Sequence, residues 1–144
     1  MCKDAVEKKI CYYTICGYKN SGKTTLITKL IPILNQSGYK VATIKHDGHD
    51  FEADVPGTDT WRHQKAGAYG SGIYSGNRFM ISKQCTDADV SVLSKFFPEA
   101  DVILLEGFKD SEFPKYWCDY PNQIPDESAV AEEIIEEIQR VREE

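Results

Sequence analysis

The stretch from Ile10 to Leu26, ICYYTICGYKNSGKTTL, decides the fold that we predict for this chain. The segment Ile10–Cys16 is short, apolar and rich in β-forming residues, so it predicts a buried strand. Gly17–Thr24 then satisfies the G-x-x-x-x-G-K-[ST] pattern. Apolar residues at helical spacing predict a helix over Thr24–Gln36, which Ser37-Gly38 ends. Because a strand precedes the glycines and a helix follows them, we favour a phosphate-binding loop over an ordinary glycine turn.

Each residue type in this loop has a chemical reason to be there. The glycines let the backbone curl, so that successive N–H groups point toward phosphate oxygens at the start of a helix. Lys23 is expected to reach the β- and γ-phosphates, and the Thr24 hydroxyl to ligate Mg²⁺. We therefore predict binding of a purine nucleoside triphosphate with magnesium by Gly17, Tyr18, Lys19, Asn20, Ser21, Gly22, Lys23, Thr24 and Thr25.

The remaining chain alternates predicted strands and helices. Such alternation predicts an α/β, three-layer P-loop NTPase fold: a mainly parallel sheet with helices on both faces and a β-hairpin insertion, in a single domain over residues 1–144. Lys45–Thr60 is polar and is expected to be a loop. The other predicted elements are a strand Tyr39–Ile44, a helix Arg62–Lys65 capped by Asp59, a hairpin of Ala68–Tyr74 and Phe79–Ser82, a helix Asp87–Phe97, a strand Asp101–Leu105 and a helix Glu127–Arg142.

Composition narrows the class of protein. The 144 residues carry a formal net charge of -6, which argues against general nucleic-acid binding. No apolar run is long enough to cross a bilayer and the N-terminus does not resemble a secretory signal, so we expect a cytoplasmic protein without a membrane partner. The five cysteines form no C-x-x-C pair, and we expect them to be reduced and structural.

Acidic and imidazole side chains follow two of the predicted strands. Glu106 ends the apolar strand, where it would hold magnesium beside the loop or remain a solvated carboxylate. The second strand is followed by His46, Asp47, His49 and Asp50, at the ligand-facing edge of such a sheet. From the residues alone, this segment fits a metal site, a substrate contact or a polar loop without a fixed role equally well.

Several motifs in order resemble the molybdopterin-guanine dinucleotide biosynthesis protein B (MobB) family. The resemblance covers roughly residues 10–115 and is more specific than the loop alone. It rests on Gly17–Ile27, Ile44–Asp50, Asp54–Arg62, Ala66–Ala68 and Leu105–Lys109. It implies GTP as the nucleotide, weak GTPase activity and a homodimer. It also implies a supporting role, beside the molybdenum cofactor guanylyltransferase, in converting molybdopterin cofactor to its guanine dinucleotide form.

The resemblance and the residues together suggest roles for the polar positions. Thr24, Glu106 and Asp47 are the candidate magnesium ligands, and His46, Asp47 and Glu106 the candidate water activators. The positions expected to sense the γ-phosphate or to face the pterin phosphate are His46, Asp47, His49, Asp50, Asp59, Thr60, Arg62, Gly107 and Lys109.

The chain also departs from the family pattern, and other functions stay open. It has no N-K-x-D motif for guanine, so the choice of base rests on the resemblance. Tyr116–Asp126 is short and rich in proline, so we expect the family's further strand to be missing or reshaped there. The alternatives are a small-molecule kinase, a metallochaperone GTPase with His46 and His49, joined by His63 or Cys85, as ligands, and an adaptor that holds nucleotide without turnover.

Overall fold

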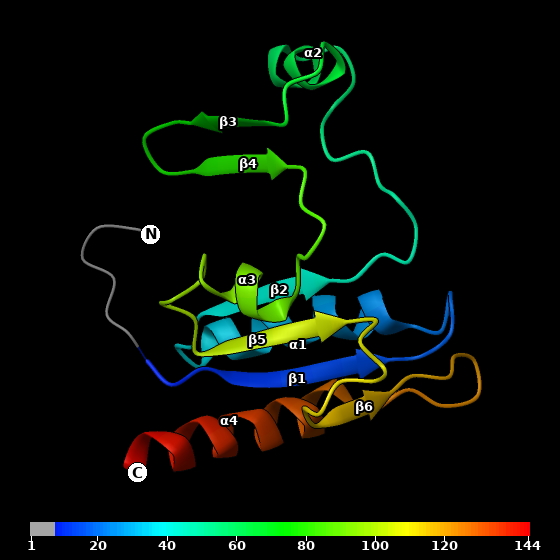
Figure 1. Cartoon of the computed structure of the whole chain (residues 1–144). Coiled ribbons are helices and arrows are strands. Elements are labelled where there is room, and N and C mark those ends of the chain that lie inside the picture. The colour runs from blue at the N-terminus through cyan, green and yellow to red at the C-terminus, as the bar shows by residue number, and fades with distance from the viewer. Residues whose placement is uncertain (1–7) are drawn as a thin grey trace. The chain divides into compact units, whose positions relative to one another are not determined.

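The computed structural model describes residues 8–144, which form two compact units (Figure 1). The sheet unit comprises the described residues up to His46 together with Asp89–Glu144, and the hairpin unit comprises Asp47–Ala88. Cys2 lies outside the described residues. That the whole chain acts as one domain stays a prediction.

A four-stranded parallel sheet forms the centre of the sheet unit. It contains β1 (Cys11–Cys16), β2 (Val41–Lys45), β5 (Val102–Glu106) and β6 (Lys115–Trp117), in the order β2-β5-β1-β6. Every pair is parallel. All five residues of β5 are buried, as its continuous apolar sequence predicted for a strand covered on both faces. The predicted parallel α/β sheet is confirmed.

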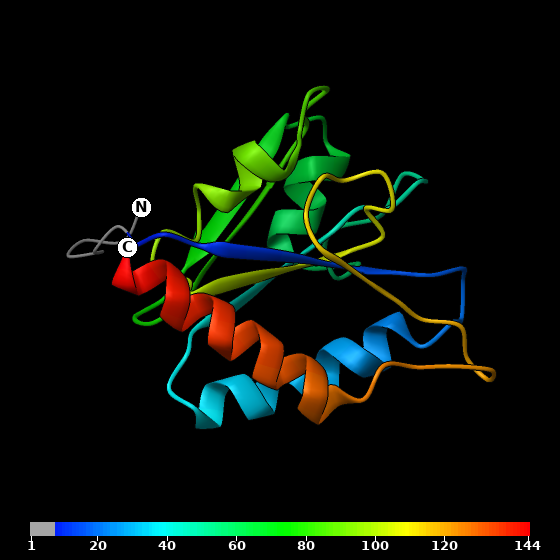
Figure 2. The same cartoon turned by 90° about the horizontal axis from the view of Figure 1, so that it is seen from below.

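Two long helices, α1 (Lys23–Gln36) and α4 (Glu127–Glu143), cover one face of this sheet and pack against each other (Figure 2). Leu26, Leu30 and Leu34 follow one another at four-residue intervals and are almost fully buried. Spacing of this kind places apolar side chains on one helix face. Gly38, with φ of 89°, follows the end of α1 as expected for a left-handed terminating residue.

The other face of the sheet carries one short helix, α3 (Val90–Ser94). Val90 and the aromatic rings of Phe108 and Phe113 pack there against a small buried cluster around Ile103. The predicted helix Asp87–Phe97 was too long at both ends. Asp89 is extended and its carboxylate accepts from Val92 N, which starts the helix late, and proline at position 98 disfavours helical backbone in the residue before it.

The hairpin unit contains α2 (Asp59–Lys65), β3 (Gly70–Tyr74) and β4 (Phe79–Lys83). The two strands pair antiparallel, which confirms the predicted hairpin. The prediction that Asp59 caps the helix was wrong. Thr58 is the extended N-terminal flanking residue, and Asp59 is the first helical residue. A carboxylate in the first turn still favours the helix through its dipole.

The segment Tyr116–Asp126 was expected to lack the family's further strand or to reshape it, and the structure shows one short strand at its start. Strand β6 begins at Lys115 and has three residues, and it pairs with β1 through Thr14–Lys115 and Cys16–Trp117. A three-residue strand after a proline gives no alternating pattern to recognise. The chain after it is irregular up to α4, apart from one isolated bridge between Asp119 and Gln123.

Candidate functional site

The glycine loop between β1 and α1 has the backbone that its pattern predicted. Gly17 and Gly22 have φ of 150° and 97°, and Asn20 between them has φ of 61°. A Cβ on Gly17 would lie 2.2 Å from Ser21 Oγ and 2.4 Å from the carbonyl oxygen of Cys118. Glycine is therefore required there both by conformation and by space.

The loop keeps most of its amides available. Within the described residues, one amide of Gly17–Thr25 donates to a protein oxygen: the Ser21 amide donates to the Tyr18 carbonyl oxygen at 3.2 Å. The Lys23 ammonium lies over the loop, 3.0 Å from the Gly17 carbonyl oxygen. The first amides of a helix have no partner within the helix. The loop therefore combines free donors, a helix N-terminus and one ammonium, which together suit a bound anion.

A buried carboxylate stands beside this loop. Glu106 ends β5, the strand next to β1, and is 8% exposed. Its Oε1 accepts a hydrogen bond of 2.6 Å from Thr24 Oγ1, and Lys45 Nζ lies 3.6 Å from its Oε2. Parallel strands present their carboxyl ends at one edge, and this edge brings Thr24 and Glu106 together although they are far apart in sequence. Sequence reasoning missed Lys45 because a lone lysine at a strand end carries no distinguishing pattern.

Two further predicted residues lie at the same edge. The His46 amide donates to the Glu106 carbonyl at 3.1 Å, and its ring lies 5.6 Å from the Phe108 ring between centroids. Gly107 has φ of 93°, and a Cβ there would meet the His46 carbonyl oxygen at 3.2 Å. Lys109 is exposed in the loop that follows. The edge thus groups Glu106, Gly107 and His46, while their chemical roles stay predictions.

The chain after β6 packs onto the glycine loop. Cys118 N donates to the Cys16 carbonyl at 2.8 Å, and Tyr120 N donates to the Ser21 carbonyl at 2.9 Å. A Cβ on Gly22 would lie 3.0 Å from Ile124 Cδ1. Sequence reasoning missed this support, because contacts between a loop and an irregular segment about 100 residues later leave no periodic signal. Burial raises the pKa of the Cys16 and Cys118 thiols, which are free and structural here.

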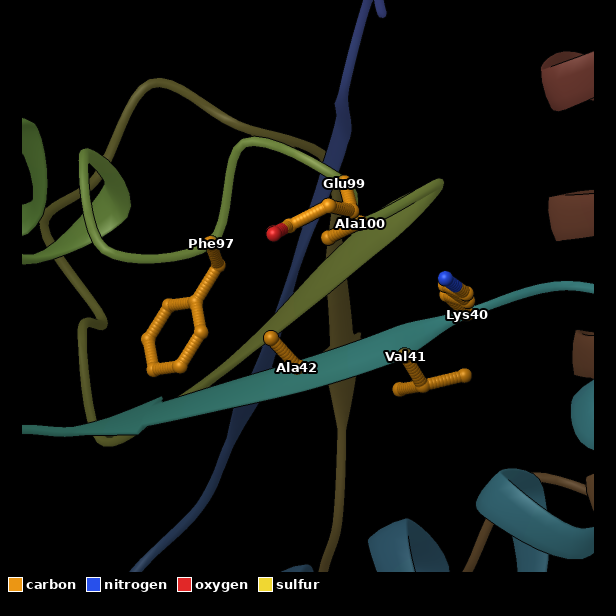
Figure 3. A pocket seen from close by; sticks show the side chains of 6 residues that line it. All are labelled: Lys40, Val41, Ala42, Phe97, Glu99 and Ala100. Carbon is orange, nitrogen blue, oxygen red and sulfur yellow. The ribbon is translucent and has the colours of Figure 1, made fainter. Parts of the chain in front are cut away.

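Two concave regions lie outside the loop. A cleft of about 240 Å³ in the sheet unit is shown in Figure 3, where the Phe97 ring and the Ala42 side chain lie along one side. It is lined by Lys40, Val41, Ala42, Phe97, Glu99 and Ala100. A second cleft, of about 560 Å³, lies within the hairpin unit and includes Trp61, Gln64 and Tyr69 in its lining. Neither cleft contains a residue of Gly17–Thr25.

A family model described as "Molybdopterin guanine dinucleotide synthesis protein B" matches residues 12–132 of the 144. The chain belongs to the MobB family. A Haemophilus influenzae protein named as a molybdopterin-guanine dinucleotide biosynthesis adapter protein is 39% identical over 105 residues, which cover 70% of this chain and 58% of that protein. The Escherichia coli protein of the same name is 36% identical over 104 residues, covering 69% of this chain and 59% of that protein.

Solved MobB structures share the fold. The crystal structure of Bacillus subtilis MobB superimposes with a TM-score of 0.66 at 27% identity, and covers 77% of this chain and 69% of that one. The chain spans less than two thirds of the length of the two sequence relatives it matches. Their names describe adapter proteins in molybdopterin-guanine dinucleotide biosynthesis.

The other site residues predicted for this MobB-family chain belong to the hairpin unit. These are Asp47, His49, Asp50, Asp59, Thr60 and Arg62. Asp47 Oδ1 accepts from the His49 amide at 3.0 Å, so this carboxylate organises its own loop. Thr60 Oγ1 donates to Asp54 Oδ2 at 2.5 Å, and this hydrogen bond holds the pKa of Asp54 below its usual value. Arg62 is exposed on α2.

Asp54 and Gln64 are structural residues of this unit that sequence reasoning did not single out. Gln64 Oε1 accepts from Ser82 Oγ at 2.9 Å, and its amide nitrogen donates to Asp54 at 3.4 Å. These contacts tie α2 to β4. Over residues 8–144, no three His, Cys, Asp or Glu side chains gather as a metal cluster would require. No helix among those residues is long and apolar enough to cross a membrane.

Proposed function

We propose that this MobB-family chain binds GTP with Mg²⁺ on Gly17–Thr25 and serves as an adapter in forming the guanine dinucleotide form of the molybdenum cofactor. The observation that carries the proposal is the hydrogen bond from Thr24 to the buried Glu106, beside a loop most of whose amides are free. The partner is the molybdenum cofactor guanylyltransferase, which performs the transfer itself. The names of the two sequence relatives support this pathway.

The donors in the site suit magnesium. A hydroxyl from Thr24 and a carboxylate from Glu106 are hard oxygen ligands of the kind that Mg²⁺ prefers, together with phosphate oxygens and water. Asp47 is the candidate for a further ligand. When bound, the ion neutralises charge on the β- and γ-phosphates. The chain's own contribution is to orient the triphosphate by its amides and by the Lys23 ammonium.

The polar segments around His46–Asp50 and Asp59–Arg62 are proposed to sense the γ-phosphate or to face the phosphate of the pterin. Arg62 suits a bidentate phosphate contact, because a guanidinium presents two parallel donors. Gly107 and Lys109, which follow β5, are proposed to take part in the same phosphate contacts. We also propose a homodimer, in keeping with the resemblance to the family.

Hydrolysis of GTP is proposed to be slow. His46, Asp47 and Glu106 are the candidates for activating water, and Glu106 already accepts from Thr24 at 2.6 Å. Positioning and charge neutralisation contribute most of phosphoryl-transfer catalysis. Turnover is expected to be slow because none of these three side chains is placed by a contact that marks it as an activator of water.

The test is calorimetric titration with GTP and ATP, with and without Mg²⁺. Lys23→Ala should weaken GTP binding by about tenfold or more, because a charge-assisted contact contributes roughly 1.5 to 3 kcal/mol. Lys29→Ala is the matched control, since Lys29 is exposed on α1 beyond the loop. A Lys23→Ala protein that keeps full affinity would refute the assignment of the loop. Circular dichroism of both variants verifies that the fold is retained.

A further inference from the structure

The loop and the metal ligands fix the direction in which a bound nucleotide must run. Thr24 and Glu106, the proposed magnesium ligands, would mark the end of the site that takes the β- and γ-phosphates. Glu106 belongs to β5, which pairs with one side of β1, while β6 pairs with the other side. The α-phosphate and the nucleoside must therefore extend away from β5, toward the chain that leaves β6.

That chain presents an exposed aromatic pair beside the glycine loop. Trp117 ends β6 and is 48% exposed, and Tyr18 in the loop is 74% exposed. Their rings meet edge to face, with centroids 5.7 Å apart. Figures 1 and 2 both draw the segment after β6 alongside the glycine loop, and the bond from Tyr120 N to Ser21 O joins them. Large apolar rings left in water at the mouth of a site suit stacking on a base.

The carboxylate of Asp119 lies close to Trp117 along the chain. Asp119 lies two residues after Trp117, and the buried Cys118 separates them. In extended chain, residues two apart lie on the same side. The backbone at Asp119 is held by its amide, which donates to the Gln123 carbonyl at 2.7 Å, and by its carbonyl, which accepts from the Asn122 amide at 2.7 Å. The carboxylate itself is less engaged: within the described residues it accepts one side-chain bond, of 3.4 Å, from Asn122 Nδ2.

We propose that this strip, defined as Tyr18, Trp117 and Asp119, is the base-recognition site, with the rings stacking on the base and the carboxylate selecting guanine. The proposal rests on the proposed binding of a nucleoside triphosphate by Gly17–Thr25. It assigns base selection to a chain that lacks the N-K-x-D pattern.

The selectivity follows from hydrogen-bond chemistry. The pairing edge of guanine presents two adjacent donors, N1–H and the N2 amino group, and an ionised carboxylate is a pure acceptor with two oxygens. Adenine presents an acceptor at N1 beside its single amino group, so it leaves one carboxylate oxygen facing a lone pair. A site built to accept two donors rejects a ligand that lacks one of them.

The first experiment compares the affinities of four ligands for the wild type and for an isosteric variant of Asp119. Asp119→Asn replaces one acceptor by a donor, which suits the C2 carbonyl of xanthine and opposes the amino group of guanine. Affinities for GTP, XTP, ATP and inorganic tripolyphosphate are measured by calorimetry with Mg²⁺. GTP binding should weaken about tenfold or more, by the scale of a bidentate base contact. XTP should bind more tightly than before, while tripolyphosphate should be unchanged. Asp110→Asn, at an exposed aspartate after β5, is the matched control and should leave all four affinities unchanged.

The second experiment uses the fluorescence of Trp117. The chain has two tryptophans, so Trp61→Phe leaves Trp117 as the single reporter. GTP should quench its emission and tripolyphosphate should not, because only GTP carries a base to stack. Trp117→Ala should weaken GTP binding about fivefold or more, on the scale of base–aromatic stacking, and leave tripolyphosphate binding intact.

The outcomes separate the two proposals. Equal wild-type affinities for GTP and ATP, or an Asp119→Asn protein with unchanged GTP affinity, would overturn base recognition while tripolyphosphate binding still supports the glycine loop. A wild-type protein that binds neither GTP nor tripolyphosphate would overturn both. A loss of tripolyphosphate binding in Asp119→Asn would also count against the inference, because it would mean that Asp119 supports the loop and not the base.

Discussion

Replacing Gly17 by alanine should destabilise the sheet unit strongly, because the first glycine of the loop has neither the conformational freedom nor the space for a side chain. Its φ of 150° is one that side chains rarely allow, and the new Cβ would lie 2.2 Å from Ser21 Oγ and 2.4 Å from the Cys118 carbonyl oxygen. The Cys118 residue directly follows β6, and its amide donates to the Cys16 carbonyl at 2.8 Å, so this stretch of backbone cannot easily retreat.

The expected loss of unfolding free energy in Gly17→Ala has two parts. A side chain in a backbone region that suits only glycine costs about 1 to 3 kcal/mol. An extra methyl group in filled space costs about 1 to 3 kcal/mol more. The sum, about 2 to 6 kcal/mol, is a large share of the roughly 5 to 15 kcal/mol by which domains are stable. Gly38→Ala isolates the first part, since Gly38 has φ of 89° but nothing within 4 Å of its Cβ position.

The assay is urea denaturation of the wild type and both variants, followed by circular dichroism. Gly17→Ala should lower the unfolding midpoint clearly more than Gly38→Ala, with the slope against urea unchanged if only stability has altered. An equal or smaller loss for Gly17→Ala would refute the close packing of the loop against the chain after β6.

Three further perturbations test other parts of the structure. Burial and the nearby Glu137 carboxylate raise the pKa of Tyr13 to about 12. The unfolded chain loses this proton near pH ~10, so the free energy of unfolding should fall by about 1 to 2 kcal/mol as the pH rises from 10 to 12. Tyr13→Phe should reduce that fall, and an unchanged pH profile would contradict the burial. Asp101→Asn should lower the free energy of unfolding, measured by urea denaturation, by about 2 to 3 kcal/mol. The buried carboxylate accepts from Lys40 N at 2.6 Å and pairs with two cations. An unchanged free energy of unfolding would refute its structural role. Glu106→Gln should reduce the dependence of GTP affinity on Mg²⁺ in calorimetry, and an unaltered dependence would remove Glu106 from the metal site.

The parts of the fold that sequence predicted are those with a local signal. The conformation of the glycine loop, the apolar run of β5 and the spacing of α1 each depend on neighbours within a few residues, and the structure confirms these three elements. The edge position of Glu106 also followed, because the carboxyl ends of parallel strands meet at one edge. Its bond to Thr24 needed the register of β1 and β5, which the structure supplies.

The parts that sequence did not predict depend on distant contacts. Strand β6 has three residues and is defined by its pairing with β1, about 100 residues earlier. The chain after β6 supports the glycine loop through backbone groups of Cys118 and Tyr120, which carry no residue preference. Helix α3 was predicted too long at its C-terminal end because apolar residues continue past Ser94. The amides of Phe96 and Phe97 there form turns and do not extend the helix. The roles of the polar residues in the hairpin unit, such as His49 and Arg62, stay predictions.

In the proposed complex, the amides of Gly17–Thr25 and the Lys23 ammonium hold the triphosphate of GTP. The most direct measurement is a titration of isotope-labelled protein with Mg²⁺ and GTP, followed through the backbone amide signals in NMR spectra. We expect the largest shifts on Gly17–Thr25, with the Gly22, Lys23 and Thr24 amides foremost. Binding of GTP that leaves these amide signals in place and shifts those of another segment would contradict this expectation.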